Sequence, residues 1–166
     1  MVKEKTLQNL KDAFAGESQA NRRYLAFAKK AEEEGYNQTA KLFRAAAEAE
    51  TVHALNHLAA MGEVKSTKEN IEAAINGETF EFTKMYPEMI KQAESDGEKA
   101  ANRSFNFANK VEEIHAKLFK NALENLESLE DEEIHVCPVC GNTFIGKTPS
   151  RCPICGADKS KFILIK

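Results

Sequence analysis

The sequence predicts a mainly α protein, in which a bundle of four helices precedes a small C-terminal module with short β-strands. Three observations support this fold class. Residues 7–129 contain a single proline, apolar residues recur there at three- and four-residue steps, and residues 135–166 contain all four cysteines. We therefore divide the chain into residues 1–134, which end in a short acidic linker at 128–134, and residues 135–166.

Four apolar stripes define the expected helices. The stripes begin at Leu7, Phe43, Ile71 and Ala101. Glycines separate them, and residues 66–69, Ser-Thr-Lys-Glu, have the form of a capping box before the third helix. Pro87 lies within the third stripe, so we expect that helix to kink or end early. Four amphipathic helices pack most simply as a four-helix bundle.

The first two helices and the last two repeat one pattern. The alignment starts with Glu17 opposite Glu78 and allows one extra residue in the second half. It pairs Gly35 with Gly97, Phe43 with Phe105, Glu50 with Glu112 and His53 with His115. A duplicated helical hairpin predicts a site on a pseudo-twofold axis between the hairpins.

Each half carries a Glu-x-x-His pair on an otherwise apolar stripe. Residues i and i+3 share a helix face, about 4.5 Å apart along the axis, so both side chains can reach one metal. Charged residues are rare on a core stripe unless they are paired or metal-bound. The expected ligands are Glu17, Glu50, His53, Glu78, Glu112 and His115. Oxygen and nitrogen donors of this kind suit iron or manganese.

The spacing alone would be weak evidence, because Glu132 and His135 share it in the charged linker, where we interpret it as incidental. Glu81 follows Glu78 by one helical step, yet the first half has alanine there, so Glu81 would serve one metal only. Tyr24 and Tyr86 follow the first glutamate of their halves by about two helical turns. They could hydrogen-bond the ligands or pack in the core.

Two cysteine knuckles form a second metal site. They read Cys137-Pro-Val-Cys140-Gly and Cys152-Pro-Ile-Cys155-Gly. Four thiolates at this spacing hold one tetrahedral ion. Residues 135–166 are too few to bury a stable core, so the metal must supply stability. Zinc would make the module structural, whereas iron would make it a one-electron carrier.

Composition and charge limit the possible functions. No apolar run approaches the roughly 20 residues of a membrane span, and residues 1–6 lack the hydrophobic stretch of a secretory signal. We therefore expect a cytoplasmic protein, in which paired cysteines bind metal more often than they form disulfides. Residues 1–134 carry a net charge of −7 and residues 135–166 a net charge of +4. The positive charge would favour docking on an acidic surface but is too small to indicate nucleic acid.

With both sites located, the whole chain resembles the rubrerythrin family, in which a ferritin-like di-iron domain precedes a rubredoxin-like domain. The resemblance rests on Gly16-Glu17-Ser18-Gln19-Ala20-Asn21, Glu50-x-x-His53, Gly77-Glu78-x-x-Glu81, Glu112-x-x-His115 and both knuckles. It implies that the di-iron ligands are Glu17, Glu50, Glu78, Glu81, Glu112 and His115. It also implies that His53 replaces Glu81 on one iron upon reduction, and that Tyr24 and Tyr86 match tyrosines near the site.

For activity, the resemblance implies a di-iron peroxidase that reduces hydrogen peroxide to water in oxidative-stress defence. A mononuclear iron held by the four cysteines, for which zinc is a possible substitute, would pass electrons from an external reductase or rubredoxin-type donor, and ultimately from NAD(P)H. Two alternatives stay open: ferritin-like iron oxidation and storage, and a zinc-structured protein without turnover. The cysteine module argues against storage, which needs no one-electron carrier.

The connection between the second and third helices is short. In a ferritin-like bundle these helices run parallel, so their connection must travel the length of the bundle. Residues 62–66 reach at most about 18 Å when fully extended. The helix between residues 50 and 62 is itself about 18 Å long, so the connection is too short to return past residue 50 and begin another long helix. We therefore expect a domain-swapped homodimer, in which the first two helices of one chain pack on the last two of the other.

Overall fold

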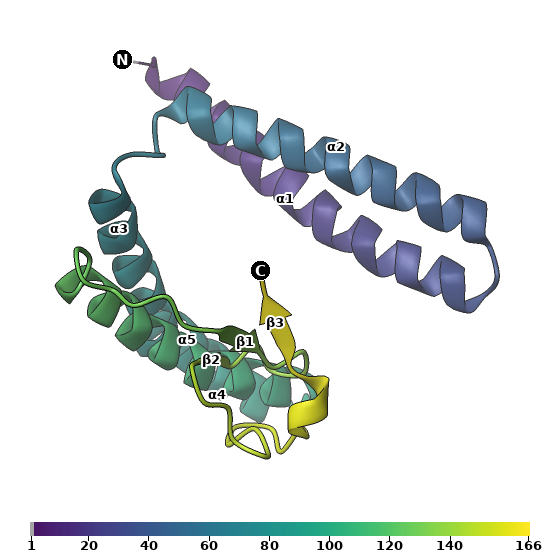
Figure 1. Ribbon diagram of the computed structural model, residues 1–166. Helices are drawn as coiled ribbons and strands as arrows, with labels where there is room; N and C mark the ends of the chain where they lie inside the picture. Colours follow the sequence, from purple (N-terminus) through teal and green to yellow (C-terminus); the bar gives the residue numbers. More distant parts are fainter. Residues whose placement is uncertain (1) are drawn as a thin grey trace. The chain divides into compact units, whose positions relative to one another are not determined.

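The computed structural model describes residues 2–166, and most of them are helical (Figure 1). The helices are α1 (Glu4–Glu33), α2 (Asn37–Met61), α3 (Thr67–Phe80), α4 (Tyr86–Ser95) and α5 (Lys99–Glu124). A five-residue π-helical segment, η1 (Glu81–Met85), joins α3 to α4. Three short strands follow α5, so the predicted fold class is confirmed: a mainly α chain with a small C-terminal module. No helix among residues 2–166 is long and apolar enough to cross a membrane.

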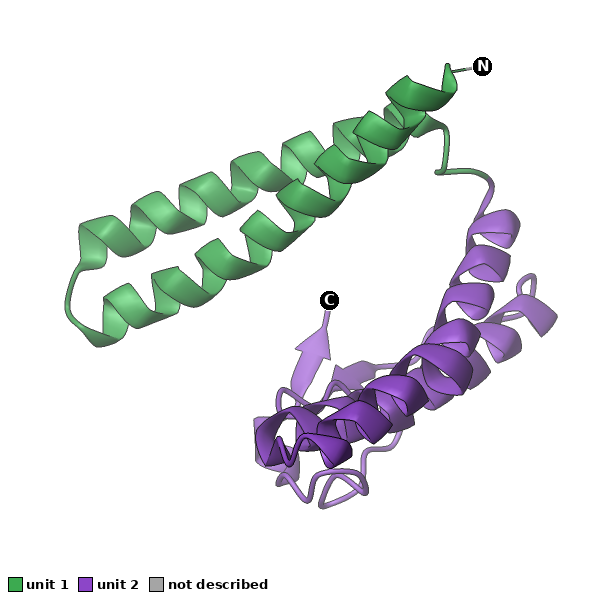
Figure 2. Ribbon diagram, turned by 180° about the vertical axis from the view of Figure 1, so that it is seen from behind, with its two compact units in different colours: residues 1–65 green, residues 66–166 purple. Residues whose placement is uncertain are grey.

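The chain divides by its internal contacts into two compact units. Unit 1 ends at Lys65, and unit 2 runs from Ser66 to Lys166 (Figure 2). Unit 2 thus contains α3, η1, α4 and α5 together with the C-terminal module. The predicted boundary between residues 134 and 135 separates two metal-binding regions rather than two packing units, and it stays a prediction.

Unit 1 is an antiparallel hairpin of α1 and α2 (Figure 1). Small side chains line the contact between the helices: Ala28, Ala31, Ala40, Ala47 and Ala54 are buried. The Asn21 amide crosses from α1 to donate to the Ala47 carbonyl at 2.7 Å and to Thr51 Oγ1 at 2.8 Å. Large apolar side chains remain exposed in this chain, among them Phe27, Leu42, Val52 and Leu55. One hairpin alone cannot cover its own apolar surface.

In unit 2, α3, η1 and α4 pack along α5. The predicted capping box is confirmed: the Ser66 hydroxyl accepts from the Glu69 N–H, and the Glu69 carboxylate accepts from the Ser66 N–H. The third helix is interrupted, as Pro87 predicted, but the interruption begins earlier, at Glu81. In η1 the Tyr86 N–H donates to the Glu81 carbonyl, five residues back, and Pro87 then lies at the start of α4, where its missing N–H costs little.

The C-terminal module is a three-stranded antiparallel sheet with two cysteine turns. Its strands are β1 (Ile134–Val136), β2 (Thr143–Ile145) and β3 (Ile163–Ile165), in the order β2-β1-β3. A 3₁₀ turn, η2 (Lys159–Lys161), precedes β3. Phe144 stacks on Phe162 at 4.8 Å between ring centroids, and β2 contacts α5. These contacts place the module against the helix that carries Glu112 and His115.

Candidate metal centres

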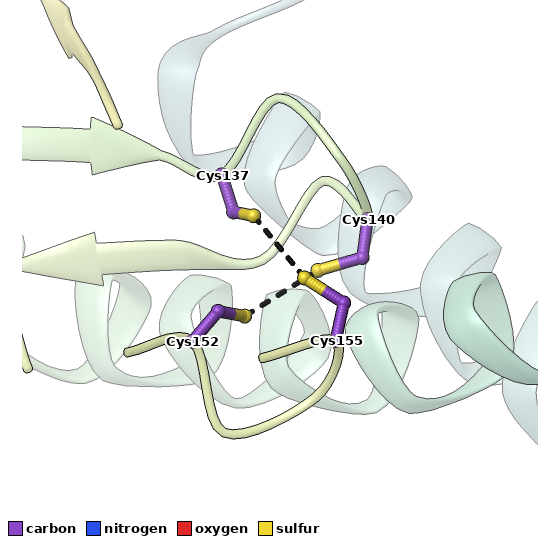
Figure 3. Close-up of side chains that lie close together, drawn as sticks. All are labelled: Cys137, Cys140, Cys152 and Cys155. Carbon is purple, nitrogen blue, oxygen red and sulfur yellow. Dashed lines mark hydrogen bonds between the residues drawn. The ribbon is translucent and has the colours of Figure 1, made fainter. Parts of the chain in front are cut away.

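The four cysteine sulfurs converge as a tetrahedral site requires. Cys137 and Cys155 have Sγ atoms 3.5 Å apart, as do Cys140 and Cys152, and all four sulfurs lie within 4.8 Å of one another (Figure 3). A disulfide needs about 2.05 Å, whereas a tetrahedron with metal–sulfur bonds of about 2.3 Å has edges of about 3.8 Å. The cysteines therefore fit one tetrahedral metal ion and not two disulfides.

Backbone N–H groups donate to the sulfurs, and glycine follows each knuckle: the N–H groups of Asn142 and Ala157, just after the glycines, donate to Cys140 and Cys155. Gly141 and Gly156 have φ of +84° and +78°, a left-handed conformation that glycine adopts without strain. Burial alone would raise the pKa of the Cys152 thiol, but N–H groups of Cys155 and Ile154 donate to it and lower that pKa to about 7.

One carboxylate–histidine group lies in unit 1, on α1 and α2. The His53 Nδ1 atom is 2.9 Å from Glu50 Oε2 and 3.8 Å from Glu17 Oε1. Potential ligand atoms of these three residues lie within 4.8 Å of one another. A metal ion at this point would receive two carboxylates and one imidazole.

The equivalent group in unit 2 lies on α3 and α5. The His115 Nδ1 atom is 2.8 Å from Glu112 Oε2 and 3.9 Å from Glu78 Oε2, so its geometry repeats that of the first group closely. Burial, and then the charge of Glu112, raise the pKa of Glu78. Carboxylates held this close without a cation favour protonation, so the donor set fits a metal ion. The structure thus brings the six predicted Glu and His ligands together as two groups of three, one in each unit.

Glu81 lies at the start of η1, outside both groups of three. Its pKa is raised by burial and then by the charge of Glu78, so the two carboxylates are neighbours. The π segment also explains the extra residue of the second half, because a π turn accommodates one residue more than an α turn. Sequence reasoning found this offset between the halves but missed the π segment that produces it.

The two predicted tyrosines make equivalent aromatic contacts. Tyr24 packs against Phe43 at 6.1 Å between ring centroids, and Tyr86 packs against Phe105 at 6.3 Å. Burial, and then the charges of Glu81, Glu112 and Glu78, raise the pKa of Tyr86, so its hydroxyl lies near the carboxylates of unit 2.

Thr143 was not among the predicted site residues. Its Oγ1 atom is 3.0 Å from the His115 Nε2 atom, and it comes from β2 of the C-terminal module. Nothing in the sequence pointed to it except its position three residues after Cys140.

Fold and donor sets together define a helical metalloprotein with carboxylate–histidine groups and a separate tetrathiolate. The family described as Rubrerythrin matches residues 8–123, and the one described as "Rubrerythrin, rubredoxin-like domain" matches residues 135–163. The chain belongs to the rubrerythrin family, as its sequence motifs predicted. Membership makes it a di-iron protein of an oxidoreductase family, with a four-cysteine iron site as the second centre.

Relatives match over nearly the whole chain. Rubrerythrin-2 of Clostridium acetobutylicum is 37% identical, over 95% of each chain. Nigerythrin of Nitratidesulfovibrio vulgaris is 36% identical, over 95% of this chain and 85% of its own. Among solved structures, the fully reduced, all-ferrous state of nigerythrin has a TM-score of 0.61 and 35% identity, covering 99% of this chain and 88% of that one.

Proposed function

We propose that this protein is a peroxidase that reduces hydrogen peroxide to two water molecules, consuming two electrons and two protons, in oxidative-stress defence. The observation that carries the proposal is that one compact unit contains both a carboxylate–histidine group and a tetrathiolate. A site for a two-electron reaction beside a one-electron carrier suits cleavage of an O–O bond. Iron storage would not need the carrier. Electrons would come from NAD(P)H through an external reductase or rubredoxin-type donor.

The metal ligands that we propose are those of the two groups together with Glu81. Glu17, Glu50, Glu78, Glu81, Glu112 and His115 would hold the di-iron centre, with His53 as the alternative ligand to Glu81. Cys137, Cys140, Cys152 and Cys155 would hold the single iron. When bound, the iron pair supplies the two electrons that break the O–O bond.

Tyr86 lies beside the unit 2 group and is not one of the proposed ligands. Burial raises the pKa of its phenol, and the charges of Glu81, Glu112 and Glu78 raise it further. The Tyr86 phenol therefore stays neutral and can donate a hydrogen bond to an oxygen atom bound in the site. We propose this phenol as a positioning group for peroxide, and Tyr24 as an aromatic packing residue of the other half.

We further propose that the active form is a domain-swapped homodimer. Only residues 62–66 connect α2 to α3, a reach of at most about 18 Å. Each hairpin also leaves apolar side chains exposed in this chain, including Phe27 on α1 and Phe80 on α3. Packing α1 and α2 of one copy against α3–α5 of another would cover such surfaces and bring two groups of three ligands together. We place this dimer in the cytoplasm, where thiols stay reduced and available to metal.

A stopped-flow experiment tests the peroxidase proposal. The iron-loaded protein is reduced without oxygen, mixed with one equivalent of hydrogen peroxide and followed by visible absorption. We expect oxidation of both centres within milliseconds, and its loss in Glu112→Ala. The matched control is Glu113→Ala, which removes a neighbouring carboxylate that is paired with Lys117 and is not one of the grouped candidate ligands.

Two results would overturn the proposal. Slow oxidation by dioxygen, with no fast reaction with peroxide, would favour iron handling. A protein that never forms the red ferric tetrathiolate, and that contains zinc on metal analysis, would favour a structural role for the knuckles.

A further inference from the structure

The His115 imidazole is held from both sides. Its Nδ1 atom faces Glu112 at 2.8 Å, while its Nε2 atom lies 3.0 Å from Thr143 Oγ1. The Thr143 hydroxyl in turn donates to the Gly141 carbonyl at 3.3 Å. With a metal on Nδ1, which faces the carboxylates, Nε2 would carry the ring proton and donate it to Thr143 Oγ1. A continuous hydrogen-bonded path thus runs from His115 to the residue that follows Cys140.

Packing fixes this path at a second point. Val111 lies one helical turn before His115 on α5 and is only 2% exposed. A β-carbon at Gly141 would lie 3.7 Å from the Val111 side chain, so the cysteine turn rests directly on α5. Helix and knuckle therefore meet through one apolar contact and one hydrogen bond. Movement of the turn after Cys140 must move Thr143, and with it the imidazole.

The duplicated half of the chain provides an internal comparison. His53, the counterpart of His115, has the same contact with its own glutamate, at 2.9 Å. Its side chain is 53% exposed, against 26% for His115. Within residues 2–166, the structure shows no hydrogen bond at its Nε2 atom comparable to the one with Thr143. Among the described residues, the His115 ring is held at both nitrogens and the His53 ring at Nδ1 alone.

We propose that Thr143 is a positioning residue. Its hydrogen bond with His115, which we call the clamp, locks the ring with Nδ1 toward the metal. The clamp also joins the tetrathiolate knuckle to the carboxylate–histidine group within one chain. Metal in the knuckle orders the turn after Cys140, and the turn orders His115 through Thr143. The inference rests on the proposed function only in taking His115 as a metal ligand. It assigns the clamp to the second half alone, because no such Nε2 contact of His53 is present among the described residues.

Nuclear magnetic resonance of the full-length protein loaded with diamagnetic zinc tests the clamp directly. The chain has only four histidines, so the ring nitrogens can be assigned. We expect a protected Nε2–H proton on His115 that correlates with Thr143, and none on His53. In Thr143→Val, exchange of this proton should accelerate by about three- to tenfold, the effect of losing one hydrogen bond. Thr143→Ser should restore the protection.

A metal titration gives the second measurement. Loss of a hydrogen-bond partner of a histidine ligand typically lowers metal affinity by about 10- to 100-fold. Thr143→Val should therefore weaken ferrous binding at the carboxylate–histidine site by about tenfold. Thr143→Ser keeps the hydroxyl and should not weaken it. Thr148→Val is the matched control, because it removes the hydroxyl of a buried threonine in the same module. If Thr148→Val weakens ferrous binding as much, the effect is general destabilisation and the clamp is wrong.

The clamp and the peroxidase can fail separately. An unprotected or Nδ1-protonated His115 in the wild type would overturn the clamp, even if peroxide reacts rapidly. A protected Nε2–H with no reaction toward peroxide would leave the clamp in place and overturn the peroxidase.

Discussion

Mixing two inactive variants should restore activity if the dimer is domain-swapped. Glu50→Ala damages the group on α1 and α2, and Glu112→Ala damages the group on α3 and α5. In a swapped heterodimer one site collects both damaged halves and the other collects two intact halves. In an unswapped heterodimer every site has one damaged half. With equal amounts and random pairing, about half of the dimers are mixed and each has one intact site, which gives about a quarter of the wild-type activity.

The assay is co-expression of the two chains under different affinity tags, followed by iron loading and the peroxide reaction. Isolated heterodimers should reach about half of the wild-type amplitude. The control combines Glu17→Ala with Glu50→Ala, which lie in the same half, so that neither arrangement yields an intact site. Mixed Glu50→Ala and Glu112→Ala dimers as inactive as this control would refute the swap and the reasoning from the length of residues 62–66.

Three further predictions concern stability. Val111→Ala should lower the free energy of unfolding by about 2 kcal/mol, since it removes buried methyl groups beside Gly141. Urea titration measures this change, and an unchanged unfolding midpoint would contradict the contact between Val111 and Gly141. Cys155→Ser should disorder the C-terminal module and leave helical circular dichroism nearly intact, because a small module without its metal cannot fold alone; a retained red chromophore would contradict this. The pKa of Glu78 is raised, so the charged form of this carboxyl is disfavoured in the metal-free fold. The stabilising contribution of the carboxyl is therefore present below its ordinary pKa of about 4.3 and is lost as the pH rises through the raised pKa. Glu78→Gln should therefore raise the melting temperature of the metal-free protein at pH 7 but not near pH 4, and a difference independent of pH would count against it.

The sequence predicted the features that depend on local pattern. Four helices, the capping box at Ser66, the four-cysteine site and the two Glu-x-x-His groups all follow from residue spacing along one helix or one turn. Contacts between elements were harder to predict. Thr143 reaches His115 only because β2 packs on α5, and no periodicity in the sequence encodes that contact. The sequence also did not show that burial and nearby carboxylates would raise the pKa of Tyr86.

Three differences between the two halves lie in unit 2, which also contains the tetrathiolate. The second half has Glu81, where the first half has alanine, and it has the extra residue taken up by η1. It also has the only one of the two ligand histidines that the described residues clamp through Nε2, by Thr143. Under the proposed function, the clamp would fix His115 as a constant ligand, whereas His53 and Glu81 would be the two ligands that exchange. Transferring a threonine partner to His53 should therefore impair ligand exchange, while leaving the contact between α5 and β2 intact.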